Sequence, residues 1–270
     1  MGEKIDILLP VYNGEKYLKE QIESLFYQTY RDIRIIIRDD GSTDGSTEVL
    51  KAYGTDPRVQ IVNDNKGNLG STKCFEELIK YVSAEYFMFC DQDDIWKPDK
   101  VENTLREIQN KEKMFPSTPL LICTDASCID SDGNMIAESF FASQRFEETL
   151  DSKEKMAALN IVQGNTCLMN NLCKNFLHDI PEDIVYDCWV ALVIAYYGKV
   201  FYMHNQTVLY RQHANNVVGS KKIGLHYFAA KFFQYRAWYR KNYVLWHSLP
   251  YKLNICKCYF WKIYFTLKRI

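Results

Sequence analysis

Residues 85–98 of the chain, EYFMFCDQDDIWKP, decide its fold. Residues 86–90 are a continuous apolar run, typical of a central strand in a parallel sheet that is covered on both faces. Open α/β sheets bind ligands just beyond the carboxyl ends of such strands. Asp91, Asp93 and Asp94 follow this run directly. They therefore fall where a ligand site is expected.

The three acids suit a divalent cation. Carboxylates this close together repel one another unless a cation or hydrogen-bond donors offset their charge. Mg²⁺ and Mn²⁺ prefer such oxygen ligands and commonly share their coordination shell with substrate phosphates. The same residues also suit a solvated acidic turn before a helix that Pro98 begins, so the wider chain has to decide between the two interpretations.

The rest of the chain alternates strand and helix patterns. This alternation, with short connections, predicts an α/β fold with an open, mostly parallel sheet flanked by helices and right-handed crossovers. Strands are expected at 5–11, 33–38, 59–62, 86–90 and 120–123, with two more over 199–210. Helices are expected at 17–28, after Asp44, at 71–82, at 98–111 and from Asp187, and residues 129–134 have hairpin-turn chemistry.

Three of the expected strands end in side chains that suit a nucleotide: residues 10–12, 38–40 and 91–94. Tyr12 can pack against a base, and Asp39 or Asp40 can accept a hydrogen bond from a base or a ribose hydroxyl. Neither common glycine-rich phosphate loop follows the first strand. A metal held by the third cluster would have to bind the diphosphate instead.

Composition and charge limit the alternatives. The chain has 270 residues, 47% hydrophobic and 25% charged, as in a globular protein of one large domain with an appendage. No charged-then-apolar leader opens it, and its longest uncharged apolar stretch, 188–197, is too short to cross a bilayer. Nine cysteines without a zinc-type pattern indicate reduced thiols in the cytoplasm.

Charge is unevenly distributed. Residues 188–270 contain 13 of the 33 Lys and Arg residues and none of the 34 acids, so this part carries +13 and the rest −14. Aromatic residues recur at helical spacing from Leu225 to Trp246, and a second aromatic and basic segment follows Pro250. We expect two amphipathic helices that contact an anionic membrane surface. The alternative is a helical cap packed on the sheet, or a face buried in a homodimer.

In series, the motifs make the chain resemble the family 2 glycosyltransferases of the GT-A fold, and in particular bacterial enzymes that add sugars such as rhamnose to surface polysaccharides. The resemblance covers residues 5–219. The motifs that carry it are Pro10-Val11-Tyr12-Asn13, Asp39-Asp40-Gly41-Ser42-Thr43-Asp44, Asn68-Leu69-Gly70, Asp91-Gln92-Asp93-Asp94, Trp96-Lys97-Pro98, Gly164-Asn165, Asp187-Cys188-Trp189 and Tyr210-Arg211-Gln212-His213.

The resemblance implies an inverting transfer. An acceptor hydroxyl attacks the anomeric carbon of the sugar while the nucleoside diphosphate leaves, which requires a general base and neutralisation of the leaving group. Asp187 matches the base of the family, although family members often have Glu, Asp or His before it where this chain has Tyr186. The alternative role of Asp187 is that of a helix N-cap.

The resemblance also implies the ligand contacts. It assigns the metal, Mn²⁺ or Mg²⁺, to Asp93 with Asp91 and His213, and leaves Asp94 the most doubtful acid of the cluster. Arg211 would stabilise the leaving phosphate, and Lys66 and Lys73 are weaker candidates for nucleotide contacts. A structural role is the alternative for His213. The residues expected to bind the nucleotide are Pro10, Val11, Tyr12, Asp39, Asp40, Asn68, Asp91 and Arg211.

The resulting hypothesis is a catalytic domain at 1–219 with a helical extension at 220–270. The enzyme would move one sugar from a UDP- or dTDP-sugar, such as dTDP-rhamnose, to a glycan or polyprenyl-linked acceptor at the inner face of the cell membrane. The Gln-x-x-Arg-Trp signature of processive synthases is absent, and no nucleic-acid partner is expected. The alternatives are a sugar-phosphate nucleotidyltransferase, which normally needs a glycine-rich basic loop after the first strand, and a non-catalytic sugar-binding protein.

Overall fold

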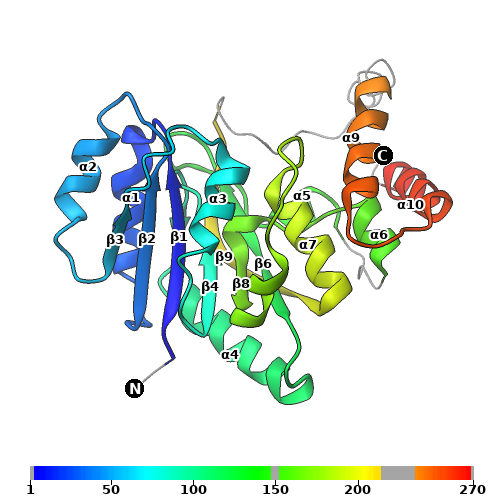
Figure 1. Ribbon diagram of the computed structural model, residues 1–270, viewed down its shortest axis with the longest axis horizontal. Helices are drawn as coiled ribbons and strands as arrows, with labels where there is room; N and C mark the ends of the chain where they lie inside the picture. Colours follow the sequence, from blue (N-terminus) through cyan, green and yellow to red (C-terminus); the bar gives the residue numbers. More distant parts are fainter. Residues whose placement is uncertain (1–2, 147–151, 214–234, 269–270) are drawn as a thin grey trace.

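The computed structural model describes residues 3–146, 152–213 and 235–268. A nine-stranded sheet forms its centre, with helices on both faces (Figure 1). The strands are β1 (Ile5–Val11), β2 (Ile33–Asp39), β3 (Val59–Val62), β4 (Tyr86–Phe89), β5 (Ile95–Trp96), β6 (Leu120–Ile129), β7 (Met135–Ala137), β8 (Cys167–Asn170) and β9 (Lys199–Arg211). The helices are α1 (Glu15–Phe26), α2 (Ser46–Tyr53), α3 (Ser71–Ile79), α4 (Lys100–Met114), α5 (Phe140–Ser143), α6 (Lys153–Ala158), α7 (Tyr186–Tyr197), α9 (Tyr235–Ser248) and α10 (Ile255–Lys268).

The sheet is parallel in one half and mixed in the other, in the order β3-β2-β1-β4-β8-β6-β9-β5 with β7 beside β6. Pairs β3–β2, β2–β1 and β1–β4 are parallel, as the alternation of strands and helices predicts. β8 is antiparallel to both of its neighbours, β4 and β6, so the predicted parallel order does not extend past β4. An antiparallel β8 brings its amino end, preceded by Asn165, to the edge where β4 ends.

The opening stretch has its predicted role. All four residues of β4 are buried, and Phe87 and Met88 have no exposed surface. β1 and β2 supply the other apolar strands of the centre. α3 and α7 contact each other on one face of the sheet, and α4 packs on β6 and β8 (Figure 1). The apolar run is therefore covered on both faces, which leaves only its carboxyl end open to a ligand.

β6 and β9 differ from their predicted extents. β6 continues from Leu120 to Ile129, and residues 199–211 form one strand where the sequence pattern predicts two. Pairing between the two strands shifts register near Asp125, where β9 carries extra residues. A bulge of this kind bends a strand without ending it, which explains the interrupted sequence pattern. The continuous pairing places Arg211 opposite Ile129, at the edge where β4 ends.

The C-terminal segment packs on the preceding part of the chain. The Nε1 of Trp246 donates to the carbonyl of Ala157 (3.1 Å), and the Tyr251 hydroxyl donates to the carbonyl of Leu192 (3.0 Å). Residues 214–234, and with them Leu225, Phe228 and Phe232 of the predicted aromatic stripe, lie outside the described residues. Trp246 is buried, as the packed-cap alternative expects for that residue. No helix in the described part of the chain is long and apolar enough to cross a membrane.

Candidate active site

The loops that follow β1, β2 and β4 are joined at one edge of the sheet. The amide N–H of Asp40 donates to the carbonyl of Val11 (2.7 Å). The side-chain amide of Gln92 binds both backbone groups of Tyr12: its Oε1 accepts from the N–H, and its Nε2 donates to the carbonyl, each at 2.9 Å. The predicted convergence of these strand ends is therefore present, and Gln92 fixes it.

Tyr12 and Asp39 are the accessible members of the expected nucleotide contacts. About half of the Tyr12 side chain is exposed. Asp39 is half-buried; one of its carboxylate oxygens accepts from the N–H of Ser42 (2.9 Å) and the other from the hydroxyl of Thr47 (3.2 Å). Each oxygen keeps further acceptor capacity. Pro10 is half-buried and Val11 fully buried, so these two position Tyr12 through the backbone.

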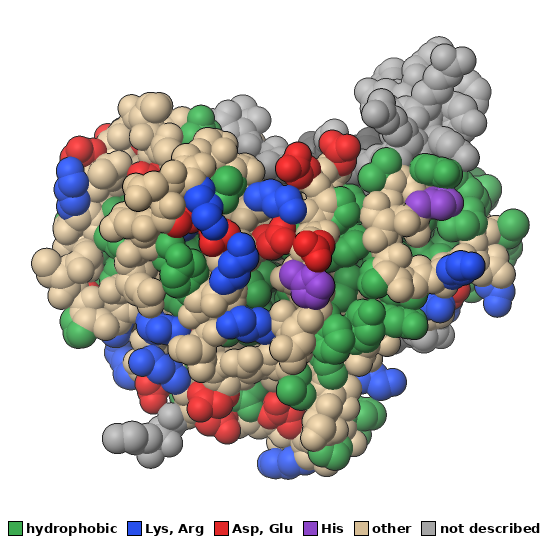
Figure 2. Space-filling view, in the orientation of Figure 1, with side chains coloured by type: hydrophobic (Ala, Val, Ile, Leu, Met, Phe, Trp, Pro, Cys, Tyr) green, Lys and Arg blue, Asp and Glu red, His purple; other side chains and the backbone are tan. Residues whose placement is uncertain are grey.

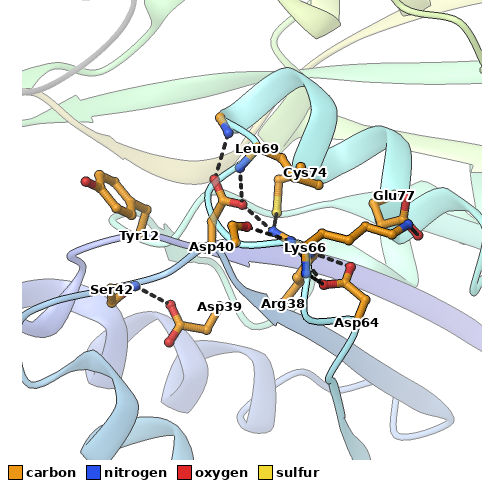
Figure 3. A network of polar contacts seen from close by, with 12 residues as sticks. Tyr12, Arg38, Asp39, Asp40, Ser42, Asp64, Lys66, Leu69, Cys74 and Glu77 are labelled. Atoms are coloured by element: carbon orange, nitrogen blue, oxygen red, sulfur yellow. Dashed lines mark hydrogen bonds and ion pairs between the residues drawn. The ribbon is translucent and has the colours of Figure 1, made fainter.

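Asp40 has a structural use instead (Figure 3). It is buried, and its carboxylate accepts from the N–H groups of Leu69 and Gly70 (2.8 Å each) and pairs with Arg38. Burial opposes the charge of Arg38, but its hydrogen bonds to Asp64 and Asp40 raise the pKa of the guanidinium. Asp40 and Arg38 thus hold the loop before α3, and Asp39 is the better placed of the two acids for a nucleotide.

The loop that Asp40 holds presents Asn68 to solvent next to Gly41: a Cβ on Gly41 would lie 3.7 Å from the Asn68 nitrogen. The lysines of this region are paired with acids. The Nζ of Lys66 lies 2.7 Å from Glu77, and that of Lys73 lies 2.8 Å from Glu76. The lysines therefore stabilise α3, which leaves Asn68 as the loop residue available to a nucleotide.

The surroundings of Asp91 disfavour its ionised form and raise its pKa. Burial, followed by the charges of Asp93 and Asp187, raises its pKa to about 7. One bond counters this shift: the Tyr186 hydroxyl donates to Asp91 at 3.3 Å. The Tyr186 ring packs on Phe75, with 4.1 Å between ring centroids. Tyr186, where the family often has an acid or a histidine, therefore supports the carboxylate cluster, a role that the sequence analysis missed.

Asp93 is joined to the last expected ligand. Its Oδ2 lies 2.8 Å from the Nε2 of His213, whose ring stacks on Tyr17 with 5.2 Å between centroids. Residues 120 positions apart are thus brought together as the motif order predicts. Both side chains are half-buried and lie at the site edge.

Two of the expected contacts serve the scaffold. Asp94 is fully buried and accepts from the side-chain amide of Asn165 and from the N–H of Arg211 (3.0 Å), while burial raises its pKa. The doubt about Asp94 is therefore justified, because both of its oxygens are bonded away from the other acids. Arg211 is buried too: its guanidinium binds Glu20 at 2.6 Å and the carbonyl of Asp93 at 2.8 Å. The sequence predicted that Arg211 contacts the donor phosphate. In the structure its guanidinium instead binds three segments of the protein itself.

Asp187 lies in the first turn of α7, which begins at Tyr186 after Val185 as the N-cap. It is therefore not the capping residue, which removes the main structural alternative. A carboxylate in the first helical turn is favoured by the helix dipole. Asp187 is half-buried, and its charge raises the pKa of Asp91, so the two carboxylates share one site.

The donor set fits a divalent cation that is shared with a substrate. Within the described ranges, no three His, Cys, Asp or Glu side chains form a ready-made metal site. Mg²⁺ and Mn²⁺ are usually held by one or two carboxylates together with substrate phosphates. Asp91 and Asp93 are two half-buried carboxylates whose mutual repulsion a cation would relieve. They are the residues that would hold it.

The fold and the residues at the carboxyl ends of β1, β2 and β4 define a class of protein. Its members are α/β proteins with a site suited to a nucleotide at the ends of parallel strands and with acidic residues beside that site. Residues 6–127 match the family model of "Glycosyl transferase family 2". An uncharacterized glycosyltransferase of Rickettsia typhi is 36% identical over 219 residues, which cover 77% of this chain and 64% of the relative. Over residues 6–127 the chain is thus similar to the glycosyltransferases of family 2.

Solved structures support the fold assignment. TarS 1-349 of S. aureus, in complex with UDP-GlcNAc, has a TM-score of 0.63 and 18% identity, covering 98% of this chain and 72% of that one. The mannosyltransferase PcManGT of Pyrobaculum calidifontis, in complex with GDP-Man and Mn²⁺, has a TM-score of 0.63 and 16% identity, with coverages of 100% and 71%. The fold is thus of the GT-A type. The chain spans less than two thirds of the length of the curated relatives it matches first.

Proposed function

We propose that the protein is an inverting, metal-dependent glycosyltransferase that moves one sugar from a nucleotide-sugar donor to a hydroxyl of a glycan or lipid-linked acceptor. The observation that carries this proposal is the arrangement of acids at one edge of the sheet. Asp91 and Asp93 lie at the end of β4, and Asp187 reaches the same site from the start of α7. Asp91 and Asp93 suit a metal ion. Asp187 lies on a different element, as is required of a general base that acts apart from the metal.

Each group then has one task. Tyr12 and Asp39 bind the base and ribose, and Asn68 closes over the nucleotide from the loop that Asp40 holds. Asp91 and Asp93 would hold the cation, which would supply positive charge to neutralise the departing diphosphate. Asp187 accepts the proton of the acceptor hydroxyl. At the same time the hydroxyl oxygen forms a bond to the anomeric carbon of the sugar, and the bond between that carbon and the diphosphate breaks. His213 orients Asp93 through their 2.8 Å contact.

The finer assignments form part of the same proposal. The donor is a UDP- or dTDP-sugar, with dTDP-rhamnose as the candidate that the motif resemblance names. The structural relatives bind UDP-GlcNAc and GDP-Man with Mn²⁺, which supports a nucleotide-sugar donor of this general kind. The acceptor is a polysaccharide precursor on a polyprenyl carrier at the inner face of the cell membrane.

Donor binding and donor cleavage test the proposal separately. A panel of UDP-, dTDP- and GDP-sugars is screened for protection against thermal unfolding, with Mn²⁺ and with chelator. We expect protection by at least one nucleotide-sugar with Mn²⁺ only, and slow release of its nucleoside diphosphate. Protection without any release points to a non-catalytic binding protein, and pyrophosphate release from a nucleoside triphosphate points to a nucleotidyltransferase. Either result contradicts the proposed function.

A further inference from the structure

Away from the donor site lies α10, the last helix that the structure describes. Its inner side packs on α6, and Cys258 and Phe265 are buried there. Its outer side carries four large apolar residues at helical spacing, Phe260, Ile263, Tyr264 and Leu267, which we call the outer stripe. Spacing of i, i+3, i+4 and i+7 is the pattern of a helix face that is normally covered.

The outer stripe is open to solvent. Phe260 is 61% exposed and Leu267 is 64% exposed, and the other two residues of the stripe are exposed as well. Figure 2 shows hydrophobic side chains with Lys or Arg among them at the side of the molecule where Figure 1 draws α9 and α10. Single exposed apolar residues are common, but a contiguous apolar face on one helix marks an interaction surface.

The charge around the outer stripe selects the kind of partner. Lys257 and Lys268 are exposed on the same helix, and α9 and α10 contain no acid. Residues 188–270 as a whole carry thirteen basic residues and no acid. A second copy of the same face would therefore bring like charges together, which opposes self-association. An anionic surface satisfies both the apolar stripe and the lysines beside it.

We propose that the outer stripe of α10 lies in the headgroup region of a bilayer of anionic lipids, with its lysines on the lipid phosphates. A helix with an apolar face, flanking lysines and aromatic residues lies in the plane of such an interface. Tyr264 and the half-buried Trp261 are residue types that favour headgroup depth. The proposal thus concerns the predicted aromatic and basic segment after Pro250, which forms α10.

This surface goes beyond the proposed transfer reaction and does not depend on it. Lipid binding needs neither donor nor cation. The protein can therefore fail to bind lipid while a nucleotide-sugar still protects it against thermal unfolding, and it can bind lipid when no nucleotide-sugar protects it. If both proposals hold, the surface holds the enzyme where a lipid-linked acceptor would be.

Co-sedimentation of the full chain with vesicles tests the proposal. We expect binding to vesicles that contain phosphatidylglycerol, weaker binding as salt rises, and little binding to pure phosphatidylcholine. The double variant Phe260→Ser/Leu267→Ser should lose about tenfold or more in partitioning, because two apolar anchors are removed. Lys257→Gln and Lys268→Gln should each cost about fivefold, the effect of one near-surface cation.

A matched control removes two apolar side chains of similar exposure elsewhere. Tyr27 is 72% exposed and Met114 is 66% exposed, and both lie outside the C-terminal helices. Tyr27→Ser/Met114→Ser should bind vesicles as the wild type does, and circular dichroism confirms that both double variants are folded. The proposal is overturned if the wild type does not bind anionic vesicles at low salt, or if the α10 double variant binds as tightly as the control. It is also overturned if sedimentation velocity shows a dimer that the α10 double variant dissolves.

Discussion

In the proposed reaction, Asp187 and Asp91 share one site but have different tasks. A general base must be ready to accept a proton, whereas a metal ligand must stay ionised. Burial, then the charges of Asp93 and Asp187, raise the pKa of Asp91 to about 7. A cation at Asp91 removes this conflict, because it favours the ionised form there. The separation of the two roles can therefore be tested at single residues.

Asp187→Asn should lower the turnover number by roughly 10²–10⁴, the usual contribution of a general base. Asn keeps the shape of the side chain in the first turn of α7. It also removes a charge that raises the pKa of Asp91, so nucleotide and Mn²⁺ should bind at least as tightly as in the wild type. Turnover and thermal protection are measured on the same preparation. An unchanged turnover number, or a loss of binding equal to the loss of turnover, would assign the base to another residue.

The raised pKa of Asp91 also predicts how stability depends on pH in chelator. Its ordinary value is 3.8, so between about pH 4 and pH 7 the folded chain keeps a proton that the unfolded chain has released. The free energy of unfolding should therefore fall as pH rises through this window. Asp91→Asn should make this dependence shallower, while burial still raises the pKa of Asp94 in the variant. Denaturant unfolding across the window measures the difference; identical slopes would mean that Asp91 is not strained.

Tyr186→Phe removes the hydroxyl that donates to Asp91 and keeps the ring that packs on Phe75 and Phe89. That bond lowers the pKa of Asp91, so its loss should raise the pKa further. We expect Mn²⁺-dependent protection by UDP to weaken about fivefold near pH 7, as for one hydrogen bond, and to recover at higher pH. The melting temperature without ligand should change little. A pH profile that is the same as that of the wild type would leave Tyr186 a packing residue only.

At the scale of elements, Asp39 and Asp40 are neighbours with different tasks. Asp40 is buried between Arg38 and the start of α3, whereas Asp39 is half-buried at the loop edge. Asp40→Asn should lower the free energy of unfolding by about 2–4 kcal/mol, because a buried guanidinium loses a charged partner. Asp39→Asn is the matched control, with a stability change below about 1 kcal/mol and weaker protection by nucleotide. The reverse pattern, measured by denaturant unfolding and thermal protection, would exchange the two roles.

The sequence predicted the elements better than it predicted the partners of their side chains. Apolar runs and helical spacing located β1, β2, β3, β4 and α3, because each pattern reports the burial of its own residues. The common edge of β1, β2 and β4 followed from their parallel order, which places all three carboxyl ends together. The direction of β8 did not follow, because no local pattern records which strand becomes its neighbour.

Partners of buried charges were the least predictable. Arg211 binds Glu20, 191 positions away, and Asp94 binds Asn165, 71 positions away. Motif order places such residues near one edge, but it does not say which will point inward. Gly164 illustrates the missing information: a Cβ there would lie 2.0 Å from the Tyr186 hydroxyl, so the glycine makes room for a residue far along the chain.

At the scale of the whole molecule, the C-terminal helices are attached to the preceding part of the chain through buried contacts that lie mainly on α6 and α7. Trp246 is buried and binds the carbonyl of Ala157 in α6, and Tyr251 binds the carbonyl of Leu192 in α7. The predicted division into 1–219 and 220–270 implies that this attachment can open while the sheet stays folded. Local opening of one unit has a lower free energy than global unfolding when its contacts are confined to a small part of the other unit, here α6 and α7.

Trp246→Ala tests this division. Truncating a buried Trp costs about 3–5 kcal/mol, and this loss should act on the attachment of α9 and α10. Amide hydrogen exchange should become faster in α9, α10 and α6, while β1 and β4 keep wild-type protection and nucleotide binding is unchanged. Tyr251→Phe, which removes one hydrogen bond at the same attachment, should produce the same pattern at about 1 kcal/mol. Faster exchange throughout the sheet in both variants would mean that the tail and the catalytic domain unfold as one unit, because the attachment is then part of the common core.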